Sequence, residues 1–262
     1  MTRSFHPLTF VLTLFLSSAP FQTLADQTLT DKVFNGQTPD EQIQMPDLRA
    51  HPAGPERKVA FFNLLIPLIE QENARITADR EWLMAMRDHG EWDSSSRQRL
   101  ASICKEYGTR CNSEHDVSWE RLLARVDVLP MQLVLIQAVE ESGWGTSRFA
   151  REGNNLFGIR CFGESCGIGQ LGSSRRYQSF ESVQEAVQAY VNNINSHNAY
   201  QKLRERRATL RAKGQVVTAL SLIPALERYS VRGEAYLSAL QSLLNTNAPL
   251  IERLRDQDAD AV

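Results

Sequence analysis

The chain has 262 residues, of which 42% are hydrophobic and 23% are charged, a composition typical of a globular protein with one substantial core. Its 29 Lys and Arg side chains stand against 31 Asp and Glu, which gives a formal net charge of -2. This balance excludes the broad basic surface with which proteins bind nucleic acid or anionic lipid. We therefore expect no nucleic-acid partner.

The N-terminal residues 1–25 are predicted to be a signal peptide. Arg3 precedes an apolar stretch from Leu8 to Leu16, and small and polar residues then lead to Ala25, the order found in secretory signals. The alternative is an uncleaved anchor at the inner membrane, but the apolar stretch is shorter than the ~20 residues that span a bilayer. We expect an exported, periplasmic protein without stable membrane insertion after cleavage.

The four cysteines form two local groups, Cys104 with Cys111 and Cys161 with Cys166. In an oxidising compartment such groups usually form disulfides. The four cysteines can be connected in three ways, and we favour the one with two local bridges. A zinc site is the alternative, but neither spacing is the C-x-x-C of a zinc knuckle, so no metal is predicted.

The first half of the chain reads as a leader followed by helices. Residues 26–56 are polar and rich in proline, which predicts an extended leader that does not pack. Residues 57–115 are predicted to form a helical extension, because apolar residues recur at helical spacing from Val59 onward. Within it Pro67 predicts a kink or a break between two helices. Further helices are predicted over 95–107 and 118–126.

A central helix is predicted from Pro130 to Glu141. Its residues are apolar almost all round, which favours burial on every face, and Gly143 and Gly145 mark its end. Residues 156–180, rich in glycine, predict a small hairpin lobe that Cys161 and Cys166 close.

The remaining elements are helical. Apolar residues at helical spacing over 183–194 predict a helix facing the core, and two more helices are predicted over 216–227 and 233–245. Residues 249–262 read as an acidic tail, disordered from Asp256 onward. The fold class is mainly α, a helical bundle around one buried helix with a small β-hairpin lobe and an added N-terminal helical region.

The end of the central helix carries two adjacent carboxylates, Glu140 and Glu141. Burial disfavours the charged form of a carboxyl group and raises its pKa, which is what a general acid needs. The two side chains point about 100° apart around a helix, so at most one faces a cleft from a given direction. The alternative is that both are solvated charges at a helix end.

The segment IQAVEESGWGTSRFAREGNNLFGIRC resembles glycoside hydrolase family 73, the N-acetylglucosaminidases of peptidoglycan. The resemblance continues through the segments at 176–180, 198–200 and 228–230 and covers residues 116–246. The segments LIEQENARI and YSVRGEAYLSAL are similar to the exported bacterial Bax proteins, a subgroup with this domain. The resemblance implies a lysozyme-like glucosaminidase domain over 116–248.

The resemblance also implies roles for individual residues. Glu141 matches the catalytic acid of the family, and Glu140 takes a position that is usually apolar, where its charge would raise the pKa of Glu141 further. The second carboxylate is predicted to be Glu164 in the lobe. The alternatives are that Glu164 is an exposed loop charge, or that the 2-acetamido group of the sugar acts in its place.

Seven further residues of the matched segments are predicted to contact substrate. For Asn154, Asn155 and Phe157 the alternative is that they fix the turn beside the cleft, whereas the hydroxyls of Tyr177 and Tyr229 favour positions on the cleft wall. The set is Gln137, Ser142, Asn154, Asn155, Phe157, Tyr177 and Tyr229.

The predicted function is hydrolysis of a β-1,4 bond of the glycan strand by an endo-β-N-acetylglucosaminidase, with peptidoglycan as partner and with no cofactor. Lysozyme-like or transglycosylase cleavage of the other bond uses similar folds and one Glu. The alternative to an enzyme is a binding protein that recognises peptidoglycan without cleaving it. The sequence indicates no protein partner.

Overall fold

The computed structural model describes residues 42–111 and 113–260, and the predicted signal peptide lies outside them. The described part is mainly α with one small antiparallel sheet, as predicted. No helix within it is long and apolar enough to cross a membrane. The α-helices are α1 Pro55–His89, α2 Ser94–Glu106, α3 Trp119–Arg125, α4 Met131–Ser142, α5 Arg148–Gly153, α6 Val183–Ser196, α7 Gln201–Ala212, α8 Ala219–Leu222 and α9 Glu234–Asp260. Short 3-10 turns occur at Leu48–Ala50, Glu114–Asp116, Asn198–Tyr200 and Ile223–Leu226.

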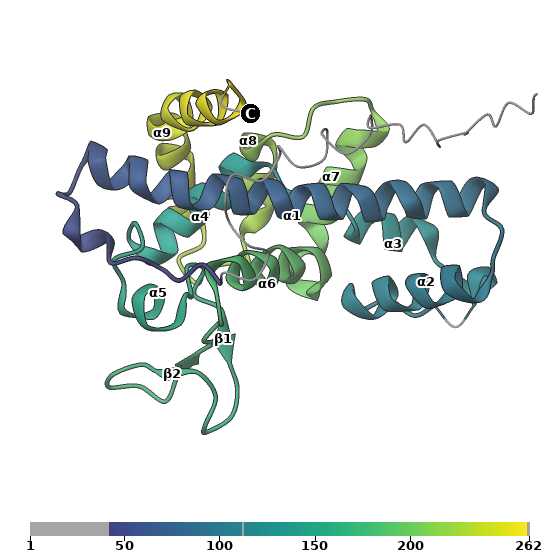
Figure 1. Cartoon of the computed structure of the whole chain (residues 1–262), viewed down its shortest axis with the longest axis horizontal. Helices are drawn as coiled ribbons and strands as arrows, with labels where there is room; N and C mark the ends of the chain where they lie inside the picture. Colours follow the sequence, from purple (N-terminus) through teal and green to yellow (C-terminus); the bar gives the residue numbers. More distant parts are fainter. Residues whose placement is uncertain (1–41, 112, 261–262) are drawn as a thin grey trace, which may run out of the picture. The chain divides into compact units, whose positions relative to one another are not determined.

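Helix α1 is one continuous helix that runs along the other helices (Figure 1). The predicted break at Pro67 is wrong. Pro67 is exposed, whereas Ile66 and Leu68 on either side of it are buried. The carbonyl that loses its hydrogen bond to proline can therefore bind water, while the buried flanks hold the helix together.

Helix α4 is the buried central helix that the sequence predicts. Every residue from Leu133 to Val139 is buried, and the helix packs against α1, α8 and α9. The connection before α4 is fixed by Arg207 of α7, whose side chain is fully buried. Its guanidinium donates to the carbonyls of Ala124, Asp127 and Val128 at 2.9, 3.0 and 3.1 Å. It thereby satisfies backbone acceptors that neither α3 nor α4 can satisfy.

A lobe of three two-residue strands projects from the helices (Figure 1). The strands β1 Arg160–Cys161, β2 Ile168–Gly169 and β3 Arg176–Tyr177 pair antiparallel in the order β1-β3-β2. Cys161 pairs with Cys166 in this lobe, and Cys104 pairs with Cys111 after α2. Both local disulfides are therefore confirmed.

The leader predicted over 26–56 is packed where the structure describes it. Met45 and Leu48 are buried, and the carbonyl of Ile43 accepts from the backbone N–H of Val183 at the start of α6, at 2.8 Å. The prediction failed because Met45 and Leu48 are isolated apolar residues among prolines and so show no periodicity in the sequence. Each nevertheless packs into the core.

The predicted acidic tail over 249–262 is also wrong as far as residue 260. Helix α9 continues through the exposed Pro249 to Asp260, because Ile251 and Leu254 are buried. These two residues extend the apolar spacing of Leu244, so packing carries the helix past the proline.

Asn154 joins the leader to the rest of the protein, and its replacement should lower stability. Its side chain accepts from the Met45 N–H at 2.8 Å and donates to Gln44 Oε1 at 3.0 Å and to the Phe180 carbonyl at 2.9 Å. Asn154→Gly should lower the free energy of unfolding by about 2–3 kcal/mol in urea titrations, because two buried backbone groups lose their partner. Asn154→Ala should cost about 1 kcal/mol more, because its φ of 53° is in the left-handed region. Equal stability of wild type and Asn154→Gly would contradict this role.

Candidate active site

Glu141 is the penultimate residue of α4, at the point where this apolar helix reaches the surface. Glu140 precedes it and forms an ion pair with Arg232, whose side chain is half exposed. The two carboxylates therefore differ, as their angular separation predicts: Glu140 has its own cation, and Glu141 faces a different set of groups.

The turn after Glu141 is built by the residues Ser142 to Gly145. Ser142 is fully buried; its hydroxyl donates to the Ala138 carbonyl at 2.6 Å and accepts from the Gly145 N–H at 2.8 Å. Gly143, Trp144 and Gly145 all have positive φ, at 58°, 61° and 71°. A Cβ atom at Gly145 would lie 2.1 Å from Met45 Cε, which would have to move, and the positive φ would strain any other residue there. Because Ser142 is buried and both its hydrogen bonds lie within this segment, they favour a structural role; its contact with substrate stays a prediction.

Trp144 holds this strained turn in place. A tryptophan with positive φ is unfavourable and needs support from its surroundings. Its ring packs edge-on against Phe61 and Phe62 of α1, with centroids 5.8 and 5.4 Å away, and Lys58 lies 5.1 Å from the ring centroid. The N-terminal extension thus anchors the turn that ends the catalytic helix.

The pKa of the Glu141 carboxyl is raised above its ordinary value. Burial is the largest cause, and the charge of Glu140 adds to it. A hydrogen bond from Tyr236 and the charge of Arg232 act in the opposite direction. On another side the carboxylate meets the backbone at Gly158, where a Cβ atom would lie only 3.3 Å from Glu141 Oε2. Gly158 therefore leaves room beside this oxygen.

A chain of buried hydrogen bonds leads to Glu141 from inside the protein. The hydroxyl of Tyr190 donates to Gln137 Oε1, and Gln137 Nε2 donates to the hydroxyl of Tyr236 at 3.0 Å. Because Tyr236 accepts this bond, its own proton is free for its hydrogen bond with Glu141. Gln137 is fully buried and its amide orients Tyr236; its contact with substrate stays a prediction.

The predicted wall residue Tyr229 belongs to an aromatic cluster beside this chain. Its ring stacks on Tyr236 with centroids 5.5 Å apart, and its hydroxyl donates to the Phe157 carbonyl at 3.0 Å. Phe157 is buried and stacks on Tyr190 at 4.1 Å. Tyr229 is partly exposed. The substrate contacts of Phe157 and Tyr229 stay predictions.

The neighbouring asparagines shape the backbone beside the site. Asn155 is buried; its side chain donates to the carbonyls of Ile159 and Gln178, both at 2.8 Å, and accepts from the Ile159 N–H at 3.0 Å. Asn154 is equally buried in the contacts described above. Both fix the turn that brings Gly158 to Glu141, which was the alternative to sugar contact. Tyr177 is partly exposed and packs on Phe149 with centroids 4.3 Å apart.

Glu164 lies exposed in the lobe, between Cys161 and Cys166. It makes no hydrogen bond or ion pair with any residue in 42–111 or 113–260. The carboxylate whose charge acts on Glu141 is Glu140. The structure thus brings Glu141, Tyr236 and Tyr229 together and leaves Glu164 apart from their contacts.

Sequence reasoning missed Tyr236 and Tyr190. Both occupy apolar positions of helices predicted from spacing, where an aromatic residue is most simply read as core. The signal that could have indicated them is Gln137, an uncharged polar residue on an otherwise apolar helix that needs buried partners.

Comparison with known proteins gives the family. A sequence model of the glucosaminidase family, described as mannosyl-glycoprotein endo-beta-N-acetylglucosaminidase, matches residues 117–247. The chain is 42% identical over 208 residues to Protein bax of Escherichia coli (strain K12), which covers 79% of this chain and 76% of that relative. The chain belongs to the glucosaminidase family.

The chain is also similar to one solved chain, from a structure of a type VI secretion system effector-immunity complex from Pseudomonas protegens. The identity is 23%, the coverage is 44% of this chain and 79% of that one, and the TM-score is 0.24. The match to the Escherichia coli relative is longer than the family segment, so some sequence outside residues 117–247 of the glucosaminidase is shared with that relative.

The groups around Glu141 should shift its pKa in opposite directions when they are removed. Glu140→Gln should lower the pKa of Glu141, because a neighbouring negative charge is lost and Arg232 no longer has a partner. Tyr236→Phe should raise it, because a hydrogen bond that favours the ionised carboxyl is lost. The measurement is an NMR titration of the Glu141 side-chain carboxyl, with Glu252→Gln on α9 as a control that leaves the pKa unchanged. Shifts of the same sign in both variants would contradict the assignment.

Proposed function

We propose that this protein hydrolyses β-1,4 bonds in the glycan strand of peptidoglycan, as an endo-β-N-acetylglucosaminidase with Glu141 as general acid. The observation that carries the proposal is the largely buried Glu141 carboxyl at the end of α4, whose pKa is raised by burial. Membership of the glucosaminidase family supports the substrate class.

The chemistry assigned to Glu141 follows from its surroundings. A raised pKa keeps a larger share of the carboxyl protonated near neutral pH, so it can give its proton to the glycosidic oxygen as the bond from that oxygen to C1 breaks. The hydrogen bond from Tyr236 then stabilises the carboxylate that remains. Gly158, which has no side chain, lets its backbone lie close beside Glu141 Oε2.

The group that stabilises C1 on its other side is the second part of the proposal. Glu164 is one candidate, as a base for the attacking water. The other is the sugar's 2-acetamido group, whose carbonyl oxygen bonds to C1 as the glycosidic bond breaks; water then opens this ring while the Glu141 carboxylate takes up its proton. The exposed position of Glu164 and its lack of contacts within the described residues favour the acetamido route.

We further propose that the protein acts outside the cytoplasm, in the periplasm. Its two disulfides support this location, because such bonds persist in oxidising compartments. The proposed signal peptide would direct export.

Glu141→Gln should lower the rate of peptidoglycan cleavage by about 10²–10⁴-fold, since proton transfer in the transition state is lost. Glu252→Gln on α9, the same change at an exposed carboxylate, is the control and should retain cleavage. Mass spectrometry of the fragments identifies the bond: N-acetylglucosamine at the new reducing end supports the proposal. N-acetylmuramic acid at the new reducing end would instead indicate lysozyme-like cleavage, and anhydro ends would indicate a transglycosylase. An inert wild type that binds glycan would favour the binding protein.

Glu164→Gln should leave the cleavage rate within about twofold of wild type if the acetamido group acts at C1. A loss of about 10²-fold or more would assign the second catalytic role to Glu164. The control is a substrate in which the acetamido groups are removed: its cleavage should stop under the acetamido route and continue under the Glu164 route.

A further inference from the structure

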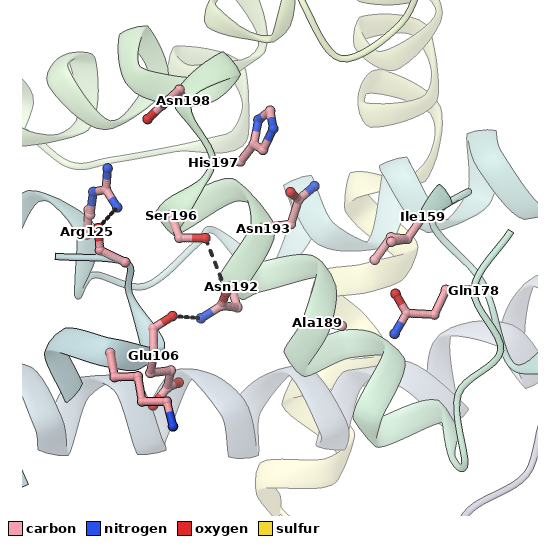
Figure 2. Close-up of a pocket in the computed structure, with 12 residues that line it drawn as sticks. Glu106, Arg125, Ile159, Gln178, Ala189, Asn192, Asn193, Ser196, His197 and Asn198 are labelled. Carbon is pink, nitrogen blue, oxygen red and sulfur yellow. Dashed lines mark hydrogen bonds between the residues drawn. The ribbon is translucent and has the colours of Figure 1, made fainter. Parts of the chain in front are cut away.

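A polar groove of about 510 Å³ lies along α6 (Figure 2). Its floor is the polar face of α6, where Asn192, Asn193 and Ser196 point into it. One wall comes from the N-terminal extension, at the end of α2, where Lys105 and Gly108 lie. The hydrogen bond from Asn192 to the Glu106 carbonyl, at 3.0 Å, fixes this wall against α6.

One end of the groove lies next to the turn at Gly158. Ile159 and Gln178 line its end, and both are held by Asn155, next to the Gly158 that faces Glu141. Along its length Asn193 hydrogen-bonds to Tyr200, whose ring packs 5.8 Å from that of Tyr229. Through Tyr229, whose ring stacks on that of Tyr236, the groove is linked by contacts to the groups around Glu141.

A second hollow of about 700 Å³ continues the groove at its far end. The two share Arg125 and Asn198 as lining residues. Its other lining cations are Arg121, Arg204 and Arg228. Together the two hollows form a continuous surface from Ile159 and Gln178 to the start of α7.

The charge of this surface is positive, although the chain as a whole is slightly acidic. Five cations line it against three carboxylates, and one of the three, Glu106, is paired with Arg75 outside the groove. Lys105, Arg121 and Arg228 are exposed and have no ion pair within residues 42–111 and 113–260. Burial lowers the pKa of Arg125, and the nearby charge of Arg121 lowers it further, the behaviour of cations gathered without a counterion.

We propose that this groove binds the anionic peptide stems that branch from the glycan strand, with the extension supplying one of its walls. The proposal rests on the proposed function for its substrate class. Stem peptides offer free carboxylates, which suit Lys105 and Arg121, and peptide amides, which suit the Asn and Ser side chains of α6. Lys105 and Gly108 lie outside the family segment 117–247, so the extension adds this recognition to the glucosaminidase domain.

The groove suits a peptide better than a lipid surface. It is concave and lined by amides and hydroxyls, whereas interfacial membrane binding needs exposed apolar side chains beside the cations. The exposed large apolar residues Phe162, Leu171 and Val231 do not line it.

The test measures binding by the full chain carrying Glu141→Gln, so that no cleavage is needed. The ligands are glycan strands with their stems and the same strands from which an amidase has removed the stems. Strands with stems should bind about tenfold more tightly, and Lys105→Glu with Arg121→Glu should abolish this difference. Lys213→Glu with Arg253→Glu is the matched control, since these exposed cations lie outside both hollows and the change of charge is the same.

Equal binding of both ligands would overturn the proposal, as would an equal loss in the control variant. Vesicles of phosphatidylglycerol are a third ligand. If Lys105→Glu with Arg121→Glu weakens binding to the vesicles but not to the strands, the groove binds lipid instead of stem peptides. Circular dichroism and thermal unfolding establish that each variant is folded. Binding is measured without cleavage, so the two proposals can fail separately. If the wild-type protein does not cleave peptidoglycan but still binds strands with stems more tightly, the proposed hydrolysis fails and the proposed binding of stems in the groove is supported.

Discussion

The hydrogen-bond chain from Tyr190 through Gln137 to Tyr236 sets the orientation of Glu141. An amide has one end that accepts and one that donates, so Gln137 fixes the direction of every bond in the chain. The proton of Tyr236 is thereby available to the Glu141 carboxyl. Because this contact comes from the buried side, the carboxyl is held from within while Gly158 leaves space beside its Oε2. A catalytic acid needs both properties at once.

The same arrangement balances the charge of the site. Burial and Glu140 favour the protonated Glu141, and Tyr236 and Arg232 favour the ionised form. Burial alone would give an acid that cannot easily lose its proton, whereas strong hydrogen bonding alone would give a carboxylate that carries none near neutral pH. A site with both influences can give the proton and stabilise what remains.

Local signals predicted the elements, but the partners of polar residues stayed hidden. The apolar run before Glu141 and the glycines after it identified α4, and the cysteine spacing identified both disulfides. The packed leader was missed because Met45 and Leu48 show no periodicity. Gln137 and the asparagines resembled substrate contacts because their true partners lie far along the chain, and a sequence pattern does not state which distant groups meet.

The extension before residue 117 packs as one body with the glucosaminidase domain. Helix α1 packs against α4, α6 and α9, and its Phe61 and Phe62 support Trp144 in a backbone conformation that tryptophan does not adopt unaided. Met45 of the leader closes on Gly145 in the same turn. Since this turn directly follows Glu141, the family segment by itself lacks the contacts that hold its catalytic helix end. The boundary drawn by sequence similarity therefore cuts through a structural unit whose two sides position one carboxyl group.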